Sequence, residues 1–176
     1  MSLELPIQSN GFILREFRPS DAMALSEIEF DPGVKRYLAL PDKSKDEWIK
    51  CVQHNGIDGW VIQVEDSLIA GCASILRAKR KGDGEIRIVI GNTFRKALGT
   101  DVAKLLIKIG FEQLSAKAIV GIVHPENTKS LRIVRRLRFR RRGKVQEPAP
   151  QWQIGHYIYR LTKGVYTCMQ TGYGDS

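Results

Sequence analysis

The chain has 176 residues, of which 43% are hydrophobic, and a formal net charge of +9. This length predicts one domain with its own core, and no apolar run approaches the ~20 residues of a transmembrane helix. The N-terminus lacks the basic flank and apolar centre of a signal peptide, and the spacing of Cys51, Cys72 and Cys168 excludes a typical metal site. We therefore expect a cytoplasmic protein with reduced thiols, no bound metal and no membrane contact.

Two patterns in the first half of the chain predict secondary structure. Ser20 and Asp21 follow a proline, and either side chain can cap a helix that begins there. Further on, the apolar runs 60–64 and 68–75 are separated by the polar residues 65–67. This arrangement predicts a β-hairpin.

The middle of the chain predicts a strand, a loop and a helix, in that order. The β-branched run Ile88–Ile90 is typical of a strand that is buried on both faces. Helical apolar spacing begins after Thr100, so we expect the helix to begin near Gly99. The first turn of a helix offers unpaired N–H groups and the positive end of the dipole. A loop that delivers Arg95 and Lys96 there, with Gly99 allowing close approach of the backbone, is suited to a pyrophosphate.

A second strand and a second helix follow. The apolar run Ala118–Val123 predicts a buried strand that leads into Pro125. Asn127 then stands where it can cap an amphipathic helix. Asn127 and Ser130 lie one turn apart, so both can face the same ligand. The four elements predict one βαβα unit that holds an anionic cofactor.

These elements and their motifs resemble the GNAT superfamily of N-acetyltransferases, and are most similar to its bacterial, Rim-like ribosomal-protein N-acetyltransferase branch. The matching segments are 95–101, Pro125–Ser130 and 137–143, and the opening segment 12–22 resembles the first strand and helix start of the same branch. The resemblance implies an α+β fold, a mixed and mostly antiparallel sheet with helices on both faces.

The likeness extends over most of the chain. We expect the acetyltransferase-like domain to span residues 1–166, and the polar, glycine-containing end, residues 167–176, to form a mobile tail.

The resemblance also implies an acetyl-transfer site with acetyl-CoA as the donor. Glu85 heads the central strand, where relatives often carry a carboxylate, and would take the proton of the acceptor amine; the alternative is an exposed glutamate at a strand end. Backbone N–H groups of the central strand would stabilise charge on the acetyl oxygen. Ser130 is the motif hydroxyl nearest to the leaving thiolate, although it could simply bond to the backbone. The cofactor-binding residues implied in this way are Ile88, Val89, Ile90, Arg95, Lys96, Ala97, Leu98, Gly99, Thr100, Asn127 and Ser130.

Three features depart from the family pattern. Counting from Arg95 places Leu98 and Thr100 where the phosphate loop normally has small residues, so the loop is one residue short if Gly99 takes the last place. Val134 replaces a tyrosine that protonates the thiolate in many members. Arg138 stands where a glycine usually ends the helix.

Charge is divided unevenly between the two halves of the chain. Residues 1–91 contain 12 Lys and Arg against 14 Asp and Glu, whereas residues 92–176 contain 16 against 5. The basic half would attract the phosphates of coenzyme A, and the acidic half would suit a cationic amine. The dense run Arg132–Arg142 is either a solvated surface or a minor contact for RNA or the ribosome.

Other candidate residues have weaker support. His124 has a pKa suited to acid–base chemistry, but next to Pro125 we expect it to pack or hydrogen-bond locally. His54 and His156 have no partners that the sequence reveals. Tyr37 and Trp48 line the acceptor cleft or belong to the core.

We therefore predict an acetyl-CoA-dependent enzyme that acetylates a primary amine, on a peptide or a small molecule, as a monomer or homodimer. One alternative is a domain of the same fold that binds coenzyme A without catalysis. A second alternative is a protein- or RNA-interaction module. The sequence does not separate a peptide acceptor from a small-molecule acceptor.

Overall fold

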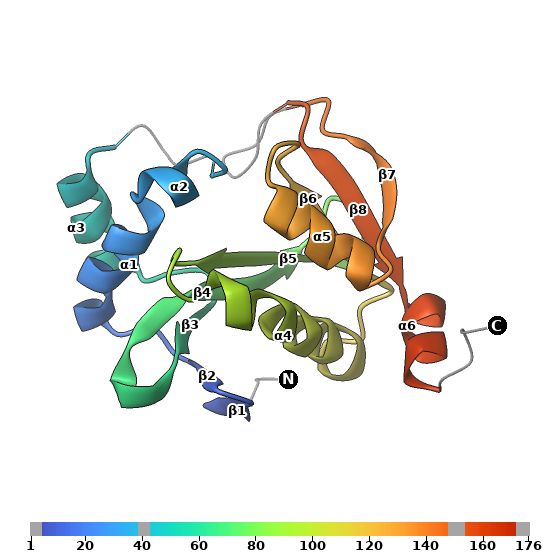
Figure 1. The fold of residues 1–176 in the computed structure, drawn as a ribbon, viewed down its shortest axis with the longest axis horizontal. Coiled ribbons are helices and arrows are strands. Elements are labelled where there is room, and N and C mark those ends of the chain that lie inside the picture. The colour runs from blue at the N-terminus through green and yellow to red at the C-terminus, as the bar shows by residue number, and fades with distance from the viewer. Residues whose placement is uncertain (1–4, 39–42, 148–153, 172–176) are drawn as a thin grey trace.

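The computed structural model describes residues 5–38, 43–147 and 154–171. They form an eight-stranded sheet in the order β1-β2-β3-β4-β5-β6-β8-β7, with the helices packed around it (Figure 1). Neighbouring strands are antiparallel except β5 and β6, which are parallel. The predicted α+β fold with a mixed, mostly antiparallel sheet is confirmed. The strands are β1 (Ile7–Ser9), β2 (Phe12–Arg15), β3 (Trp60–Gln63), β4 (Ile69–Arg77), β5 (Asp83–Ile90), β6 (Ala118–Val123), β7 (Arg140–Lys144) and β8 (Tyr157–Thr162).

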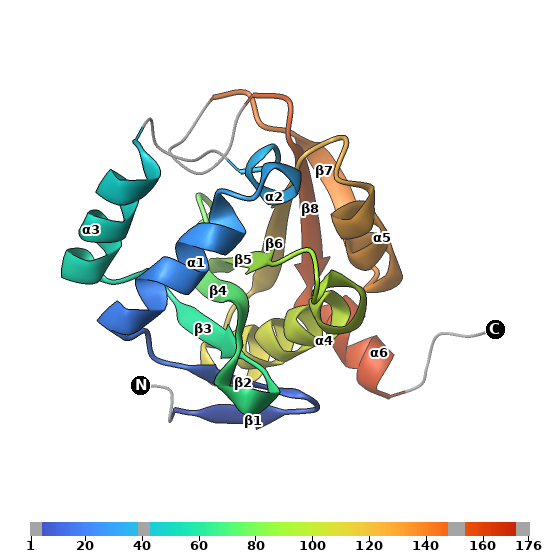
Figure 2. The same cartoon turned by 60° about the vertical axis from the view of Figure 1, so that its left-hand side comes forward.

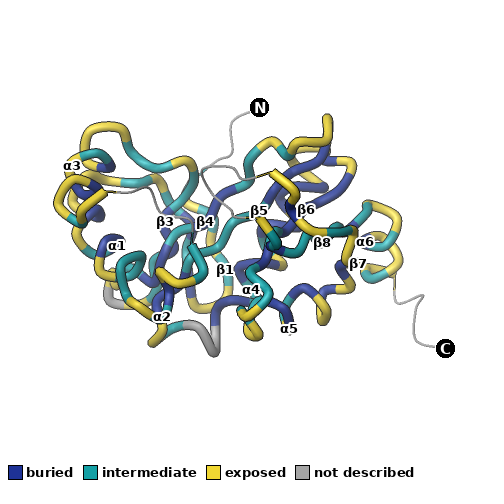
Figure 3. Tube along the Cα trace, turned by 90° about the horizontal axis from the view of Figure 1, so that it is seen from above, coloured by how far each residue is buried: buried dark blue, intermediate teal, exposed yellow. Residues whose placement is uncertain are grey.

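The helices lie in two layers, one on each face of the sheet (Figure 2). Val61 and Cys72 face the layer of α1 and α3, whereas their strand neighbours Ile62 and Ala73 face α4. α5 and α6 pack on the same side as α4, against β6 and β8. Seen from above, buried residues concentrate between the two layers (Figure 3). The helices are α1 (Ala22–Glu29), α2 (Pro32–Lys35), α3 (Lys45–Asn55), α4 (Arg95–Lys108), α5 (Thr128–Arg136) and α6 (Lys163–Gln170).

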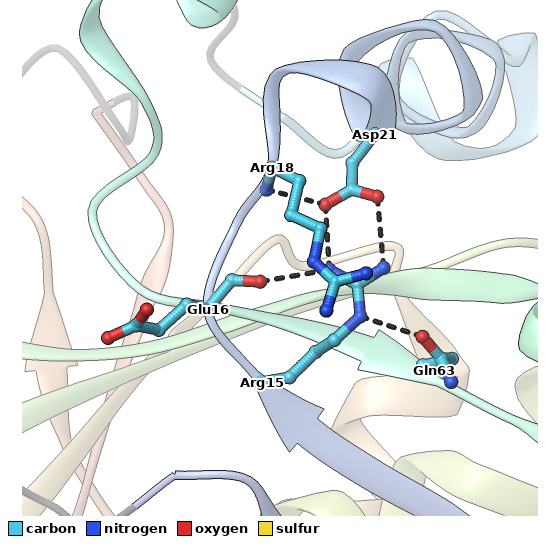
Figure 4. A network of polar contacts seen from close by, with 5 residues as sticks. All are labelled: Arg15, Glu16, Arg18, Asp21 and Gln63. Atoms are coloured by element: carbon cyan, nitrogen blue, oxygen red, sulfur yellow. Dashed lines mark hydrogen bonds and ion pairs between the residues drawn. The ribbon is translucent and has the colours of Figure 1, made fainter.

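The start of α1 is fixed by an ion pair rather than by a side-chain cap. Asp21 precedes the helix but accepts hydrogen bonds from the Arg18 N–H and from both terminal nitrogens of Arg15, at 2.7 to 2.9 Å. Arg15 also donates from Nε to Gln63 on β3, at 2.7 Å (Figure 4). Burial alone would raise the pKa of Asp21, but Arg15 and the Arg18 N–H outweigh it and hold the pKa below its usual value.

Three predicted elements match the structure closely. The hairpin of β3 and β4 turns through a short helical segment, Glu65–Ser67, and β6 has the bounds expected from the sequence. α5 begins where the Asn127 side chain accepts a hydrogen bond from the Ser130 N–H, at 3.2 Å.

At the end of α5, an arginine takes the position where the family pattern has a glycine. Arg138 has φ +57°, the left-handed conformation that glycine adopts at this place in many helices. The Arg138 N–H bonds to the Arg135 carbonyl, and the Phe139 N–H bonds to the Val134 carbonyl, at 3.0 and 2.9 Å. Both bonds of a Schellman motif are therefore present although the turn residue is arginine.

α4 begins one turn earlier than predicted. The expected phosphate loop, residues 95–100, forms its first turns, and the Leu98 N–H already bonds to the Phe94 carbonyl at 3.3 Å. Lys, Ala and Leu are strong helix formers, and the turn from Gly91 to Phe94 supplies the reversal that the loop was expected to make. At its other end α4 continues into a π-helical turn, Ile109–Gln113.

The C-terminal boundary also differs from the expectation. Residues 167–170 belong to α6, so the boundary expected after residue 166 falls inside a helix. Tyr166 anchors this helix, since its ring stacks on Phe111 with centroids 4.8 Å apart and its hydroxyl donates to Glu112 at 2.7 Å. Residues 172–176 lie outside the described part of the chain. None of the described helices is long and apolar enough to cross a membrane.

Candidate functional site

The two parallel strands separate partway along their length. Paired positions between β5 and β6 end at Glu85 opposite Val120, although β5 continues to Ile90 and β6 to Val123. Residues 86–89 are half-buried for this reason, whereas Ile90 is buried, so the prediction that Ile88–Ile90 are buried on both faces is wrong for Ile88 and Val89. The divergence leaves a wedge in the middle of the sheet, and the backbone of β5 in this wedge is not paired with β6.

A cavity of about 230 Å³ occupies this wedge, and residues from both faces of the sheet line it. Paired residues of neighbouring strands share a face, so the register sorts its walls into two groups. The wall on the side of α4 and α5 is mainly apolar: Ile86, Ile88, Ile90, Gly99, Ala103, Gly121, Val123, Asn127, Ser130, Ile133, Val134, Leu137 and Phe139. The wall on the side of α1 and α2 carries most of the ionisable groups: Val34, Tyr37, Leu38, Glu85, Arg87, Val89, Ile122, His124 and His156.

Glu85 is a buried carboxylate at the narrow end of the wedge. Its side chain is 5% exposed, and it accepts a hydrogen bond from Arg87 Nε at 3.0 Å. Burial raises the pKa of Glu85 above its usual value, and the charge and hydrogen bond of Arg87 oppose this rise only in part. The group is therefore suited to exchange a proton nearer to neutral pH than an exposed glutamate.

Two histidines stand together at the wide end of the wedge. Val123 of β6 is paired with Tyr157 of β8, so His124 and His156 occupy the next opposed positions, with ring centroids 5.1 Å apart. The ring of Tyr37, which follows α2, lies 5.4 Å from His124. The sequence reveals no partner for His156, because the pairing depends on a strand register between residues that are 32 positions apart. The one available signal is that each histidine flanks an apolar strand.

The N-terminal turn of α5 forms part of the opposite wall. Asn127, Lys129 and Ser130 all line the cavity, and the Asn127 side chain is held by its bond to the Ser130 N–H. A helix N-terminus attracts negative charge, and Lys129 adds a positive one. This wall is suited to an anionic or hydrogen-bonding ligand.

The structure distributes the predicted cofactor residues among different places. Ile88, Val89, Ile90, Gly99, Asn127 and Ser130 line the cavity. Leu98 instead belongs to the core and is 7% exposed. Thr100 lies in α4 and is not among the residues that line the cavity. Arg95, Lys96 and Ala97 form the first turn of α4, at the helix end that favours an anion.

Gly99 lies inside α4 rather than in a loop, and it lines the cavity. A Cβ there would meet Ile133 Cδ1 of α5 at 3.0 Å, so the lack of a side chain leaves room between the two helices beside the cavity. Trp48 belongs to the core under α1, whereas Tyr37 lines the cavity. No three His, Cys, Asp or Glu side chains in the described ranges gather as metal ligands would.

Comparison with known proteins gives relatives over nearly the whole chain. The uncharacterized N-acetyltransferase p20 of Bacillus licheniformis is 26% identical over 166 residues, which cover 87% of this chain and 93% of the relative. The crystal structure of a GNAT-family acetyltransferase from Bacillus anthracis has a TM-score of 0.76 at 20% identity, covering 91% of this chain and 99% of that one. The ribosomal-protein-S5-alanine acetyltransferase of Vibrio fischeri has a TM-score of 0.65 at 16% identity, with 90% and 97% covered.

The family assignment rests on a match to residues 12–140, which include the separated strands and the N-terminal turn of α5. The matching family model is the acetyltransferase (GNAT) domain. The wedge in the sheet, the solved structures of similar fold and this match agree. The chain therefore belongs to the GNAT family and is an acetyltransferase.

Proposed function

We propose that the protein transfers an acetyl group from acetyl-CoA to a primary amine, with both substrates bound at once in the wedge between β5 and β6. The observation that carries this proposal is that residues from both faces of the sheet line one cavity at that point. The two walls differ chemically, since one is mainly apolar and includes the first turn of α5, whereas the other bears most of the ionisable side chains. Two different substrates, one against each wall, would therefore meet in the middle.

The α4–α5 side fits the donor. When bound there, acetyl-CoA would supply a thioester whose carbonyl carbon is open to attack by an amine. The apolar wall of Ile88, Ala103 and Ile133 suits the pantetheine arm, and the first turns of α4 and α5 suit phosphates. Past Glu85, where pairing of β5 with β6 ends, the backbone N–H of Ile88 would donate to the acetyl carbonyl and polarise it.

The α1–α2 side fits the acceptor. An amine enters as its ammonium form, and the Glu85 carboxylate attracts this charge and then takes the proton, directly or through water. Its raised pKa favours proton uptake near neutral pH. Ser130, on the donor wall, is the hydroxyl that we assign to the departing sulfur, since Val134 cannot donate a proton.

A peptide amine is the acceptor that the family resemblance favours. The similarity to the ribosomal-protein-S5-alanine acetyltransferase of Vibrio fischeri supports this choice at the level of fold. Because the GNAT fold hosts many acceptors, the choice depends on the acceptor side of the cavity.

Calorimetry with acetyl-CoA tests the donor site. Gly99→Trp should abolish binding, because the new side chain must fill the cavity or displace Ile133. Gly164→Trp is the matched control, since Gly164 is also a helical glycine but has open space around its Cβ. Binding by the wild type and the control, with loss in Gly99→Trp, supports the proposal. No binding by the folded wild type, or equal binding by all three proteins, refutes the proposed donor site.

A further inference from the structure

The histidine pair on the acceptor wall has no task in the mechanism above. Among the described residues, His156 Nε2 is the one buried side-chain nitrogen or oxygen without a hydrogen-bond partner. His156 as a whole is 6% exposed and lines the cavity beside His124. A buried polar atom without a partner costs free energy, so this nitrogen needs an explanation, and a hydrogen bond to a bound substrate supplies one.

The environment of each ring fixes its hydrogen-bonding character. His124 Nδ1 accepts a hydrogen bond from the Glu126 N–H at 3.1 Å, so in the neutral ring the proton resides on Nε2. His124 therefore presents an N–H donor from the cavity wall. Burial, together with the neighbouring His124, lowers the pKa of His156 from its usual value, which favours the neutral ring. A neutral imidazole has one nitrogen that accepts.

The charges on the cavity wall limit the acceptor to one positive group. Glu85 is the sole acidic residue among those described as lining the cavity, and it is already paired with Arg87. Lys129 and Arg87 line the same cavity with positive charge. A polyamine would bring two or more ammonium groups to a site with one carboxylate, and its other charges would have no partner.

From this geometry we propose that the His124–His156 pair determines acceptor specificity by binding an amide group next to the reacting amine. The His124 N–H donates to the carbonyl oxygen of the acceptor, and His156 accepts from its amide N–H, while Glu85 holds the ammonium. The acceptor class is a singly charged α-amine followed by an amide, which occurs at a peptide N-terminus and in a free amino acid amide. This inference rests on the proposed function, because it names the acceptor of the same site.

Four acceptors and three variants test the proposal. The acceptors are an alanine-led hexapeptide, alaninamide, sec-butylamine, which has an amine but no amide, and spermidine. The variants are His124→Phe, which keeps a ring but removes the donor, His124→Gln, which restores an N–H, and His156→Phe. His54→Phe is the control, because His54 is exposed at the end of α3, away from the cavity. Thiol release from acetyl-CoA gives kcat and KM for each combination.

The wild type should use alaninamide or the peptide with a higher kcat/KM than sec-butylamine and spermidine. His124→Phe should lower kcat/KM for the amide-bearing acceptors about tenfold or more, mainly through a higher KM. For sec-butylamine, the same variant should change kcat/KM less than about twofold. His156→Phe should act in the same direction, His124→Gln should recover part of the loss, and the control should match the wild type. Comparison of kcat/KM for the peptide with kcat/KM for alaninamide distinguishes a protein substrate from a small-molecule substrate.

The opposite results would overturn the inference without touching the proposed function. They are a wild-type preference for spermidine, or losses in His124→Phe and His156→Phe that are equal for all four acceptors. If His124→Phe does not fold, His156→Phe and the wild-type acceptor preference still decide. Absence of turnover with every acceptor would refute the proposed function and this inference together.

Discussion

The Asp83 carboxylate accepts two hydrogen bonds from the Arg160 guanidinium, at 2.7 and 3.0 Å, although β6 lies between their strands. Asp83 is on β5 and Arg160 on β8, and the Asp83 side chain is 1% exposed. The pair lies where β5 and β6 are still in register, directly before they separate. It therefore ties the two halves of the sheet together at the narrow end of the wedge.

Loss of this pair should destabilise the fold. Arg160→Leu leaves the Asp83 carboxylate buried without its partner, and we expect a loss of about 3 kcal/mol in the free energy of unfolding. Urea denaturation measures the change. Lys79→Leu is the control, since the Lys79–Glu147 pair lies at the surface and its loss should leave the midpoint unchanged. Equal midpoints for the two variants would show that the pair does not hold the sheet together.

Glu85→Gln should impair the chemical step and spare donor binding. We expect kcat to fall by about 10²–10⁴, because the amide cannot take a proton, with little change in acetyl-CoA affinity by calorimetry. In the wild type, kcat/KM should fall as the pH decreases through the raised pKa of Glu85. Arg87→Gln removes a positive charge that lowers the pKa of Glu85, so the fall in kcat/KM should occur at higher pH in this variant. Full activity in Glu85→Gln would show that another group acts as the base.

Glu29, at the end of α1, should make stability depend on pH. Burial raises its pKa from 4.5 to about 7, so the folded state holds this proton more tightly than the unfolded state. The contribution of protonated Glu29 to the free energy of unfolding is fully present below pH 4.5 and is lost as the pH rises towards 7. Glu29→Gln should therefore gain about 1–3 kcal/mol relative to the wild type between pH 4 and pH 8, measured by urea denaturation at both pH values. A gain that does not vary with pH would contradict this assignment.

The cysteines should react at different rates with a thiol reagent. Burial and the neighbouring Glu29 raise the pKa of the Cys72 thiol, which donates to Glu29 Oε1 at 3.7 Å. Cys168 is exposed on α6. Mass spectrometry after brief alkylation at pH 8 should find Cys168 modified and Cys72 intact in the native protein. Rapid modification of Cys72 without unfolding would be inconsistent with this burial.

Local sequence patterns were sufficient to predict elements whose cause is local. The β-branched run of β6, the polar turn between β3 and β4 and the Asn127 cap each depend on neighbouring residues, and all three are confirmed. The predicted start of α4 is too late, because a basic segment before an apolar stripe suggests a loop although its residues favour helix.

The acceptor side of the cavity could not be predicted in the same way. His156 lies beside His124 through the register of β6 and β8, and Tyr37 contacts His124 from the turn after α2. These contacts depend on tertiary structure, which the spacing of residues in one sequence does not encode. The half-exposure of β5 has the same origin, since it follows from the divergence of a neighbouring strand.

The two outer strands of the sheet discourage self-association. β1 is three residues long and is preceded by Pro6, and β7 presents Arg140, Arg141, Arg142 and Lys144 within five positions. A second copy that paired with β7 along its edge would bring like charges opposite one another, which is unfavourable. The sheet therefore ends without offering a template for cross-β aggregation, and a homodimer of this protein would have to form through helices or loops instead of a continuous intermolecular sheet.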